Sequence, residues 1–262
     1  MTRIAVLLKP VPETTGLEGF GPDLRVNRTG AADAINPYDE YALEAALRLV
    51  EGTAAEIEIV LVSMAPTSIP DPVRKGLAMG AHRAVVVSDP LLQGSDTLST
   101  TRVLAAALAT LHCDLVMAGS ESSDGRGGVV PAGIATLLQL PYLSNASSVE
   151  LAGLTVRVRR PSATGSDTVE TPLPALVCMA QITGEPRYPS LRGIMAARSK
   201  IVAPMSLSDL GLAADGLGGG NALTKVISVR RTLPRGPALV VDQPPADAAK
   251  TILHYLRQRG FA

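Results

Sequence analysis

Short, continuous apolar runs alternate with helical patterns along the first half of this 262-residue chain. The runs are rich in Val, Ile and Leu and lie at Arg3–Lys9, Glu56–Ser63, Arg83–Ser88 and Cys113–Gly119. Runs of this length without polar alternation are typical of strands buried on both faces. The helical patterns between them lie at Pro37–Val50, Pro72–Met79 and Thr97–Leu111. Because strand–helix–strand repeats join parallel strands, we predict an α/β fold whose parallel sheet has helices on both faces.

The helix expected at Pro37–Val50 has a well-specified start. Asn36 is a good N-cap, and Pro37 suits the first helical position. Glu44 and Arg48 are spaced i, i+4, so we expect them to form an ion pair on the outer face of this helix.

The pattern changes after Pro141, and core positions become sparse beyond Lys200. We expect a hairpin of Ser148–Leu151 with Thr155–Arg160, a buried strand at Ala175–Ala180, a flexible break at Gly216–Gly220 and a final amphipathic helix at Ala246–Arg259. So few core positions beyond Lys200 favour an α/β domain of residues 1–200 followed by an arm of residues 201–262. We expect the arm to pack on a partner chain.

Composition argues against several classes of function. The 24 basic and 24 acidic residues balance, so the chain lacks the concentrated positive charge of nucleic-acid-binding proteins. No apolar run reaches the ~18–20 residues of a membrane span, and no secretory signal is recognised, so we expect a soluble, cytoplasmic protein. Cys113 and Cys178 lie in apolar runs and are expected to be free core thiols. The histidines lack the spacing of a metal site.

The segment Gly119–Pro131 carries the clearest binding signal. It follows an apolar run, is rich in small residues, and leads into a helix with Pro131 in its first turn. Glycines let successive backbone N–H groups face one concavity, and the start of a helix adds partial positive charge, so the segment suits a phosphate, with Arg126 as a partner. A plain strand-to-helix turn is the alternative, because neither a Walker loop nor Gly-x-Gly-x-x-Gly is present.

Two other candidates belong to the same sheet edge, since ligands of parallel sheets bind beyond the carboxyl ends of the strands. Asn36 needs no ligand if it caps its helix, and Met64 suits a core position as well as a contact with a base. No Ser, Cys or Lys nucleophile has an identifiable base, so we predict no catalytic residue. Nucleotide binding without chemistry on the nucleotide is the favoured interpretation.

Several motifs, in one order along the chain, resemble those of the β subunit of electron-transfer flavoproteins, the family that includes the FixA-type proteins. They are Ile4–Lys9, Asn36–Glu40, Leu77–Arg83, Asp114–Gly119 leading into Asp124, Glu185–Leu191 with Ile194–Ala197, and Ser208–Gly211. The collinear match runs from Arg3 to about Gly211.

The resemblance implies a Rossmann-like, adenine-nucleotide-binding domain and an arm that wraps an α subunit. It also implies an FAD held mostly by the α subunit and an AMP held structurally by this chain. Tyr38 would lie near the flavin ring. The cofactor-binding residues implied are Leu7, Asn36, Tyr38, Met64, Gly119, Asp124, Gly125, Arg126, Gly127, Gly128, Val129 and Val130.

The resemblance further implies that electrons come from flavin-dependent dehydrogenases and leave to a membrane-linked or other redox acceptor, such as a quinone oxidoreductase. The partner-docking residues implied are Ile182, Thr183, Glu185, Arg187 and Tyr188. Ile182 and Thr183 stand where the family's anchoring leucine is expected. Glycines also replace most of the polar side chains of the family's phosphate loop.

Two other interpretations were weighed against this one. A bifurcating-type subunit would hold a second FAD in the AMP site, and AMP is preferred because plain carriers are the commoner type. A stand-alone adenine-nucleotide-binding sensor would have no α subunit, and the arm argues against it. Catalysis on a nucleotide is disfavoured, because the Ser-Gly-Gly-x-Asp-Ser signature of pyrophosphate-cleaving relatives is absent.

Overall fold

The computed structural model describes residues 1–13, 19–28, 33–66, 71–181, 184–230 and 242–261. Contacts within the chain divide it into two units, Met1–Ile227 and Ser228–Ala262. Whether the residues beyond 200 act as an arm on a partner chain stays a prediction.

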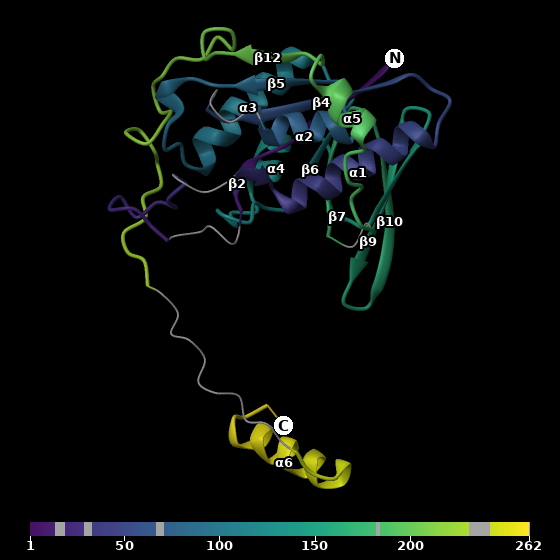
Figure 1. The fold of residues 1–262 in the computed structure, drawn as a ribbon, viewed down its shortest axis with the longest axis vertical. Helices are drawn as coiled ribbons and strands as arrows, with labels where there is room; N and C mark the ends of the chain where they lie inside the picture. Colours follow the sequence, from purple (N-terminus) through teal and green to yellow (C-terminus); the bar gives the residue numbers. More distant parts are fainter. Residues whose placement is uncertain (14–18, 29–32, 67–70, 182–183, 231–241, 262) are drawn as a thin grey trace. The chain divides into compact units, whose positions relative to one another are not determined.

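The larger unit is built on a seven-stranded sheet in the order β12-β5-β4-β1-β6-β11-β7, and every neighbouring pair is parallel (Figure 1). The strands are β1 (Thr2–Leu7), β4 (Ile57–Met64), β5 (Arg83–Val87), β6 (Leu115–Gly119), β7 (Tyr142–Ala146), β11 (Ala175–Met179) and β12 (Val202–Met205). The prediction of an α/β fold with a parallel central sheet is confirmed.

Helices cover both faces of this sheet (Figure 1). On one face lie α1 (Pro37–Glu51), α2 (Asp71–Met79) and α5 (Leu191–Ala197), and on the other α3 (Thr97–Leu111) and α4 (Val130–Leu137). Alternate residues of each strand point to opposite faces, so Ile4 and Val6 of β1 join the first core, while Ala5 and Leu7 join the second. A short 3-10 turn, Pro90–Leu92, precedes α3.

Two smaller sheets complete this unit. The antiparallel strands β8 (Ser148–Ala152), β9 (Thr155–Ser162) and β10 (Gly165–Pro172) confirm the expected hairpin and add a third strand to it. The sequence does not predict β10, because its residues are mostly polar and exposed. The strands β2 (Pro10–Pro12) and β3 (Asp33–Ile35) form an antiparallel ribbon just before α1.

The residues after Lys200 contribute more to the larger unit than their sequence indicates. β12 extends the central sheet beside β5, and Leu207 and Leu217 are buried in the second core. The break expected at Gly216–Gly220 contains turns in which Gly219 N–H donates to the carbonyl of Gln93, and its flexibility stays a prediction. The Leu217 side chain anchors this turn, and a glycine count alone does not reveal that contact.

The smaller unit contains α6 (Pro245–Gln258), which confirms the last expected helix within one residue at each end. None of its residues is buried, and Ile252 and Leu253 expose their side chains.

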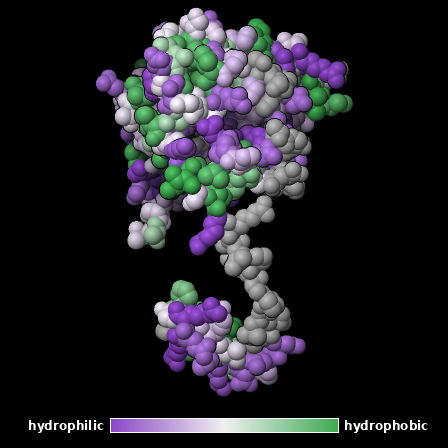
Figure 2. Space-filling view, turned by 90° about the vertical axis from the view of Figure 1, so that its left-hand side faces the viewer, coloured by the Kyte–Doolittle hydropathy of each residue, from purple (hydrophilic) through white to green (hydrophobic). Residues whose placement is uncertain are grey.

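On the larger unit, hydrophobic and hydrophilic side chains are interspersed over the face shown in Figure 2. Over the part of the chain that the structure describes, no helix is both long and apolar enough to cross a membrane.

Candidate functional site

Three neighbouring strands bring predicted binding residues to one edge of the sheet. β1 lies between β4 and β6, so the strand ends at Leu7, Met64 and Gly119 face the same side of the molecule. Leu7 and Gly119 are buried, and Met64 is half-buried against the core beneath α3 and α4. This packing fits the alternative in which Met64 fills a core position. Its contact with a base stays a prediction.

Asn36 joins the start of α1 to the loop that follows β6. Its Nδ2 donates to the carbonyl of Glu121 at 2.8 Å, and its Oδ1 accepts from Ser123 N–H at 3.1 Å. The expectation that Asn36 caps the helix is wrong, because it occupies the N-cap position without a side-chain capping bond. Both ends of its amide are used to shape the loop instead.

Asp39, in the first turn of α1, ties this helix to two strand ends. Its fully buried carboxylate accepts the backbone N–H of Lys9 at 2.8 Å and that of Gly119 at 3.3 Å. Burial raises the pKa of Asp39 to about 7, and these hydrogen bonds partly oppose that rise. The sequence indicates only a residue suited to a helix start, since acidic residues favour that position.

The loop between β6 and α4 has two left-handed residues and, within the described ranges, N–H groups without a protein partner. Arg126 and Gly128 adopt φ values of 47° and 64°, a conformation that also occurs in anion-binding loops. In the described part of the chain, the N–H groups of Gly127, Gly128 and Val129 donate to no protein acceptor. The helix α4 then begins at Val130 with a proline in its first turn, as predicted.

Asp124 is the centre of an ion-pair cluster at this loop. Its carboxylate accepts from Lys9 Nζ at 2.7 Å and from Arg28 Nε at 3.1 Å, and the Arg28 Nη2 also contacts it. Burial opposes ionisation of Asp124, but Lys9 and Arg28 outweigh it and lower its pKa to about 2. Asp124 therefore serves as the anchor for two cations. No sequence pattern singles out Arg28, which lies 96 positions away from its partner.

The two remaining polar candidates of the loop region are less constrained. Arg126 is exposed and makes no ion pair within the described ranges. Tyr38 is half-buried beside Glu121, and a hydrogen bond with that carboxylate raises the Tyr38 pKa. Gly125 is exposed, and its N–H donates to Ser122 Oγ at 3.3 Å.

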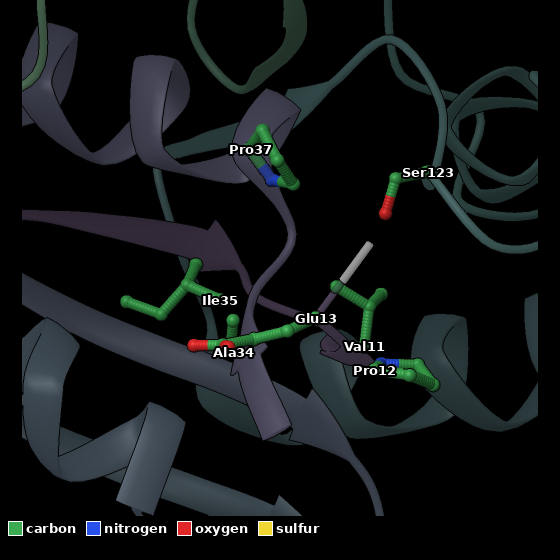
Figure 3. Close-up of a pocket in the computed structure, with 7 residues that line it drawn as sticks. All are labelled: Val11, Pro12, Glu13, Ala34, Ile35, Pro37 and Ser123. Carbon is green, nitrogen blue, oxygen red and sulfur yellow. The ribbon is translucent and has the colours of Figure 1, made fainter. Parts of the chain in front are cut away.

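A cavity of about 210 Å³ opens beside this loop. In Figure 3, Ser123 reaches from the loop toward the ribbon of β2 and β3, and Pro37 lies at the start of α1. The lining residues are Val11, Pro12, Glu13, Ala34, Ile35, Pro37 and Ser123. Three segments far apart in the sequence thus meet at one hollow. None of the predicted cofactor-binding residues lines it.

The predicted docking residues divide into three groups. Ile182 and Thr183 lie outside the described residues. Glu185 and Tyr188 are exposed, and Tyr188 has 90% of its surface accessible. Arg187 is half-buried and pairs with Glu44 and Glu51 of α1.

Glu44 does form the expected ion pair with Arg48, at 2.8 Å. The expectation that it lies on an outer face is wrong, however, because only 4% of Glu44 is exposed. The segment that carries Arg187 covers this side of α1, which the helical pattern by itself does not reveal.

The described residues include no group of His, Cys, Asp and Glu side chains that could hold a metal ion. Cys113 and Cys178 are free, with Cys178 buried and Cys113 half-buried. Burial raises the pKa of both thiols. A raised pKa suits core thiols, as the sequence predicted.

Comparison with known proteins places this chain in a family. The family model described as "Electron transfer flavoprotein domain" matches residues 23–210. The electron transfer flavoprotein subunit beta of Mycobacterium leprae is 36% identical over 262 residues, covering 98% of each chain. The subunit beta of Clostridium acetobutylicum is 31% identical and covers 99% of each chain, and the protein FixA of Azorhizobium caulinodans is 37% identical over 76% of this chain and 74% of its own. The chain therefore belongs to the electron transfer flavoprotein β subunit family, which includes FixA.

Proposed function

We propose that this chain is the β subunit of a heterodimeric carrier that holds AMP structurally and shares an FAD with an α subunit. The α subunit holds most of that FAD. Electrons pass from flavin-dependent dehydrogenases to a membrane-linked or other redox acceptor, such as a quinone oxidoreductase. The observation that carries the proposal is the loop after β6, where unbonded N–H groups lie beside the cluster of Lys9, Arg28 and Asp124.

The formal charges of the described residues around this loop cancel, so the support for an anion comes from its N–H groups and from the exposed Arg126. The three cations are Lys9, Arg28 and Arg126, and the three acids are Asp124, Glu121 and Asp33, which interacts with Arg28. A phosphate monoester carries about −1.5 to −2 charges at neutral pH and accepts hydrogen bonds on three oxygens. We expect the N–H groups of Gly127, Gly128 and Val129 to donate to these oxygens, as at other anion-binding helix starts.

The other predicted residues have supporting roles in this proposal. Leu7 and Gly119 provide a buried floor at the strand ends, and Asn36 fixes the loop through its two hydrogen bonds. We expect Tyr38 to lie near the flavin that the α subunit holds. The bound flavin supplies the redox chemistry, while this chain binds, orients and presents it.

A surface for a dehydrogenase is proposed at residues 184–195. Tyr188 is accompanied there by other apolar side chains that face outward, with Leu191 77% and Met195 64% exposed. Exposed apolar groups that cluster in one segment mark an interaction surface more often than isolated ones do.

The test is to co-express the chain with an α subunit, denature the purified complex and identify the released nucleotides by mass. One FAD and one AMP per heterodimer would support the proposal. Two FAD and no AMP would make this a bifurcating-type subunit, with the second FAD in the AMP site. A monomer without flavin would reduce the function to that of an adenine-nucleotide-binding sensor.

A further inference from the structure

The guanidinium of Arg187 is bound by α1. Its Nε donates to Glu44 at 2.7 Å, and its Nη2 donates to Glu44 at 3.1 Å and to Glu51 at 3.0 Å. Another hydrogen bond joins Nη1 to Glu51. Four of the five N–H groups of an arginine side chain are thus used inside the chain, so Arg187 has little donor capacity left for a partner.

Glu44 and Glu51 are ionised, and their two negative charges are balanced by Arg187 and Arg48. Burial opposes ionisation of Glu44, but hydrogen bonds from Arg187 and Arg48 outweigh it and lower the Glu44 pKa. Hydrogen bonds to Glu51 and Glu44 in turn raise the pKa of Arg187. Glu44 also accepts the backbone N–H of Arg187 at 3.1 Å. This arrangement, the Arg187 clamp, therefore holds both the main chain and the side chain of residue 187.

Glu185 and Tyr188, on either side of Arg187, face solvent and are not bound by α1 in the part of the chain that the structure describes. Glu185 is exposed and has no ion pair within the described residues, and Tyr188 is almost fully exposed. A cavity of about 300 Å³ lies between this segment and the helices α1 and α2. It is lined by Glu40, Lys75, Glu185, Pro186, Arg187 and Tyr188, and within it Lys75 pairs with Glu40 at 2.7 Å.

We propose that Arg187 is a positioning residue, and that its clamp holds residues 184–190 in the form in which Glu185 and Tyr188 contact an electron-transfer partner. The identity of that partner rests on the proposed function, whereas the effect of the clamp on the segment does not. The proposal replaces the expectation that Arg187 itself docks. An unpaired carboxylate beside an exposed aromatic ring fits a basic side chain, because both attract a cation. The partner surface is therefore expected to present Arg or Lys here.

The decisive variant is Glu51→Ala, because it weakens the clamp without leaving a buried charge unpaired. Glu51 is exposed and lies at the end of α1, where alanine is well tolerated. We expect exchange of the Arg187 amide hydrogen, which is bonded to Glu44, to become about two- to fivefold faster in the heterodimer. The KM for the carrier, measured with the flavin-dependent dehydrogenase recovered as its electron donor, should rise by up to about tenfold with kcat unchanged. The matched control is Glu56→Ala, an exposed acid outside the clamp.

If Arg187 docks on the partner instead of positioning the segment, Glu51→Ala should have a different effect. If Arg187 contacts the partner directly, Glu51→Ala frees its guanidinium, so that KM stays unchanged or falls and the exchange rate does not change. Arg187→Lys should resemble Glu51→Ala in both measurements, because a lysine cannot reproduce the forked hydrogen bonds. Glu185→Gln should raise KM without altering exchange, since it removes a contact and leaves the clamp intact.

Failure of the proposed function would be recognised separately. If no dehydrogenase reduces the heterodimer, the carrier role is wrong, yet the exchange measurement still tests the clamp. Unchanged exchange in both Glu51→Ala and Arg187→Lys would overturn the positioning role whatever the partner is.

Discussion

The carboxylate of Asp39 accepts the backbone N–H of Lys9 at 2.8 Å, and this bond fastens the first turn of α1 to the chain just beyond β1. The same carboxylate accepts the N–H of Gly119, the last residue of β6. Because β1 and β6 are neighbours in the sheet, one buried side chain fixes the spacing of the two strand ends. Both sides of the candidate nucleotide loop depend on that spacing.

Asp39 should give the free energy of unfolding an unusual pH dependence. Its folded-state pKa of about 7 is higher than the ordinary value of 3.8. As the pH rises from about 4 to 7, the unfolded chain loses this proton while the folded chain keeps it, so the stability that Asp39 contributes falls. Asp39→Asn removes this titration. The substitution also places an NH₂ group against a backbone donor, which costs about 1–3 kcal/mol.

The measurement is urea unfolding of both proteins at pH 5 and pH 8. The wild-type protein should exceed Asp39→Asn in stability by more at pH 5 than at pH 8. An equal difference at the two values would show that Asp39 is already ionised in the folded protein.

Asp124 should act in the opposite direction and in a lower pH range. Its pKa of about 2 in the folded state means that its contribution is complete above about pH 4 and is lost as the pH falls toward 2. Asp124→Asn should lose about 1 kcal/mol at pH 7 and lack this acid-dependent component. It should also reduce the AMP content of the heterodimer without reducing FAD, because Lys9 and Arg28 lose their anchor. Acid unfolding and nucleotide analysis, with Glu56→Gln as control, test both effects.

The two central glycines of the loop should differ in their tolerance of a side chain. Gly128 has a left-handed φ of 64°, where alanine costs about 1–2 kcal/mol. Gly127 lies outside the left-handed region, and a Cβ there would meet only Thr97 Oγ1, at 3.7 Å. We therefore expect Gly128→Ala to lower the AMP retained by the heterodimer and Gly127→Ala to retain most of it. Equal retention in the two variants would mean that the backbone of residue 128 does not shape the site.

Gly119 has no room for any side chain. A Cβ would lie 2.5 Å from the carbonyl carbon of Tyr38 and 2.6 Å from an oxygen of Asp39. Both atoms belong to the start of α1, which is fixed by the bonds described above, so Gly119→Ala should destabilise the protein by about 1–3 kcal/mol. The control is Gly220→Ala, because Gly220 is exposed, lies outside the left-handed region and would have no atom within 4 Å of an added Cβ. A thermal melt of the two variants is sufficient to distinguish them.

The elements that sequence patterns did predict were predicted closely, because each depends on local periodicity. The helix at Thr97–Leu111 has the predicted ends, and the predicted strands differ by one or two residues, whereas β2, β3, β7, β10 and β12 were not predicted. Contacts across the chain were not predictable in this way. The hydrogen bonds of Asn36, the Arg28–Asp124 pair and the burial of Glu44 all depend on tertiary packing of segments far apart. The loop after β6 was identified because glycine and proline act through the local backbone.

The end of the larger unit can be tested by truncation. The sequence pattern places this boundary after Lys200, whereas the contacts within the chain place it after Ile227. Thr224 donates from its backbone N and its hydroxyl to Asp96, which also caps α3 through Ser99 N–H. A chain ending at Ile227 keeps this anchor, the strand β12 and the buried Leu207 and Leu217. A chain ending at Lys200 loses them all.

Truncation at these two positions should therefore separate folding from assembly. If residues 228–262 form a separate unit, the chain of residues 1–227 should unfold at the same urea concentration as the full chain. The chain of residues 1–200 should be less stable by several kcal/mol, because each buried leucine contributes about 1.5–3 kcal/mol. If residues 228–262 pack on the α subunit, the 1–227 chain will form the heterodimer more weakly despite its intact fold. Equal heterodimer affinity of the 1–227 and full-length chains would remove those residues from the interface, and lower stability of the 1–227 chain would show that α6 packs on its own subunit.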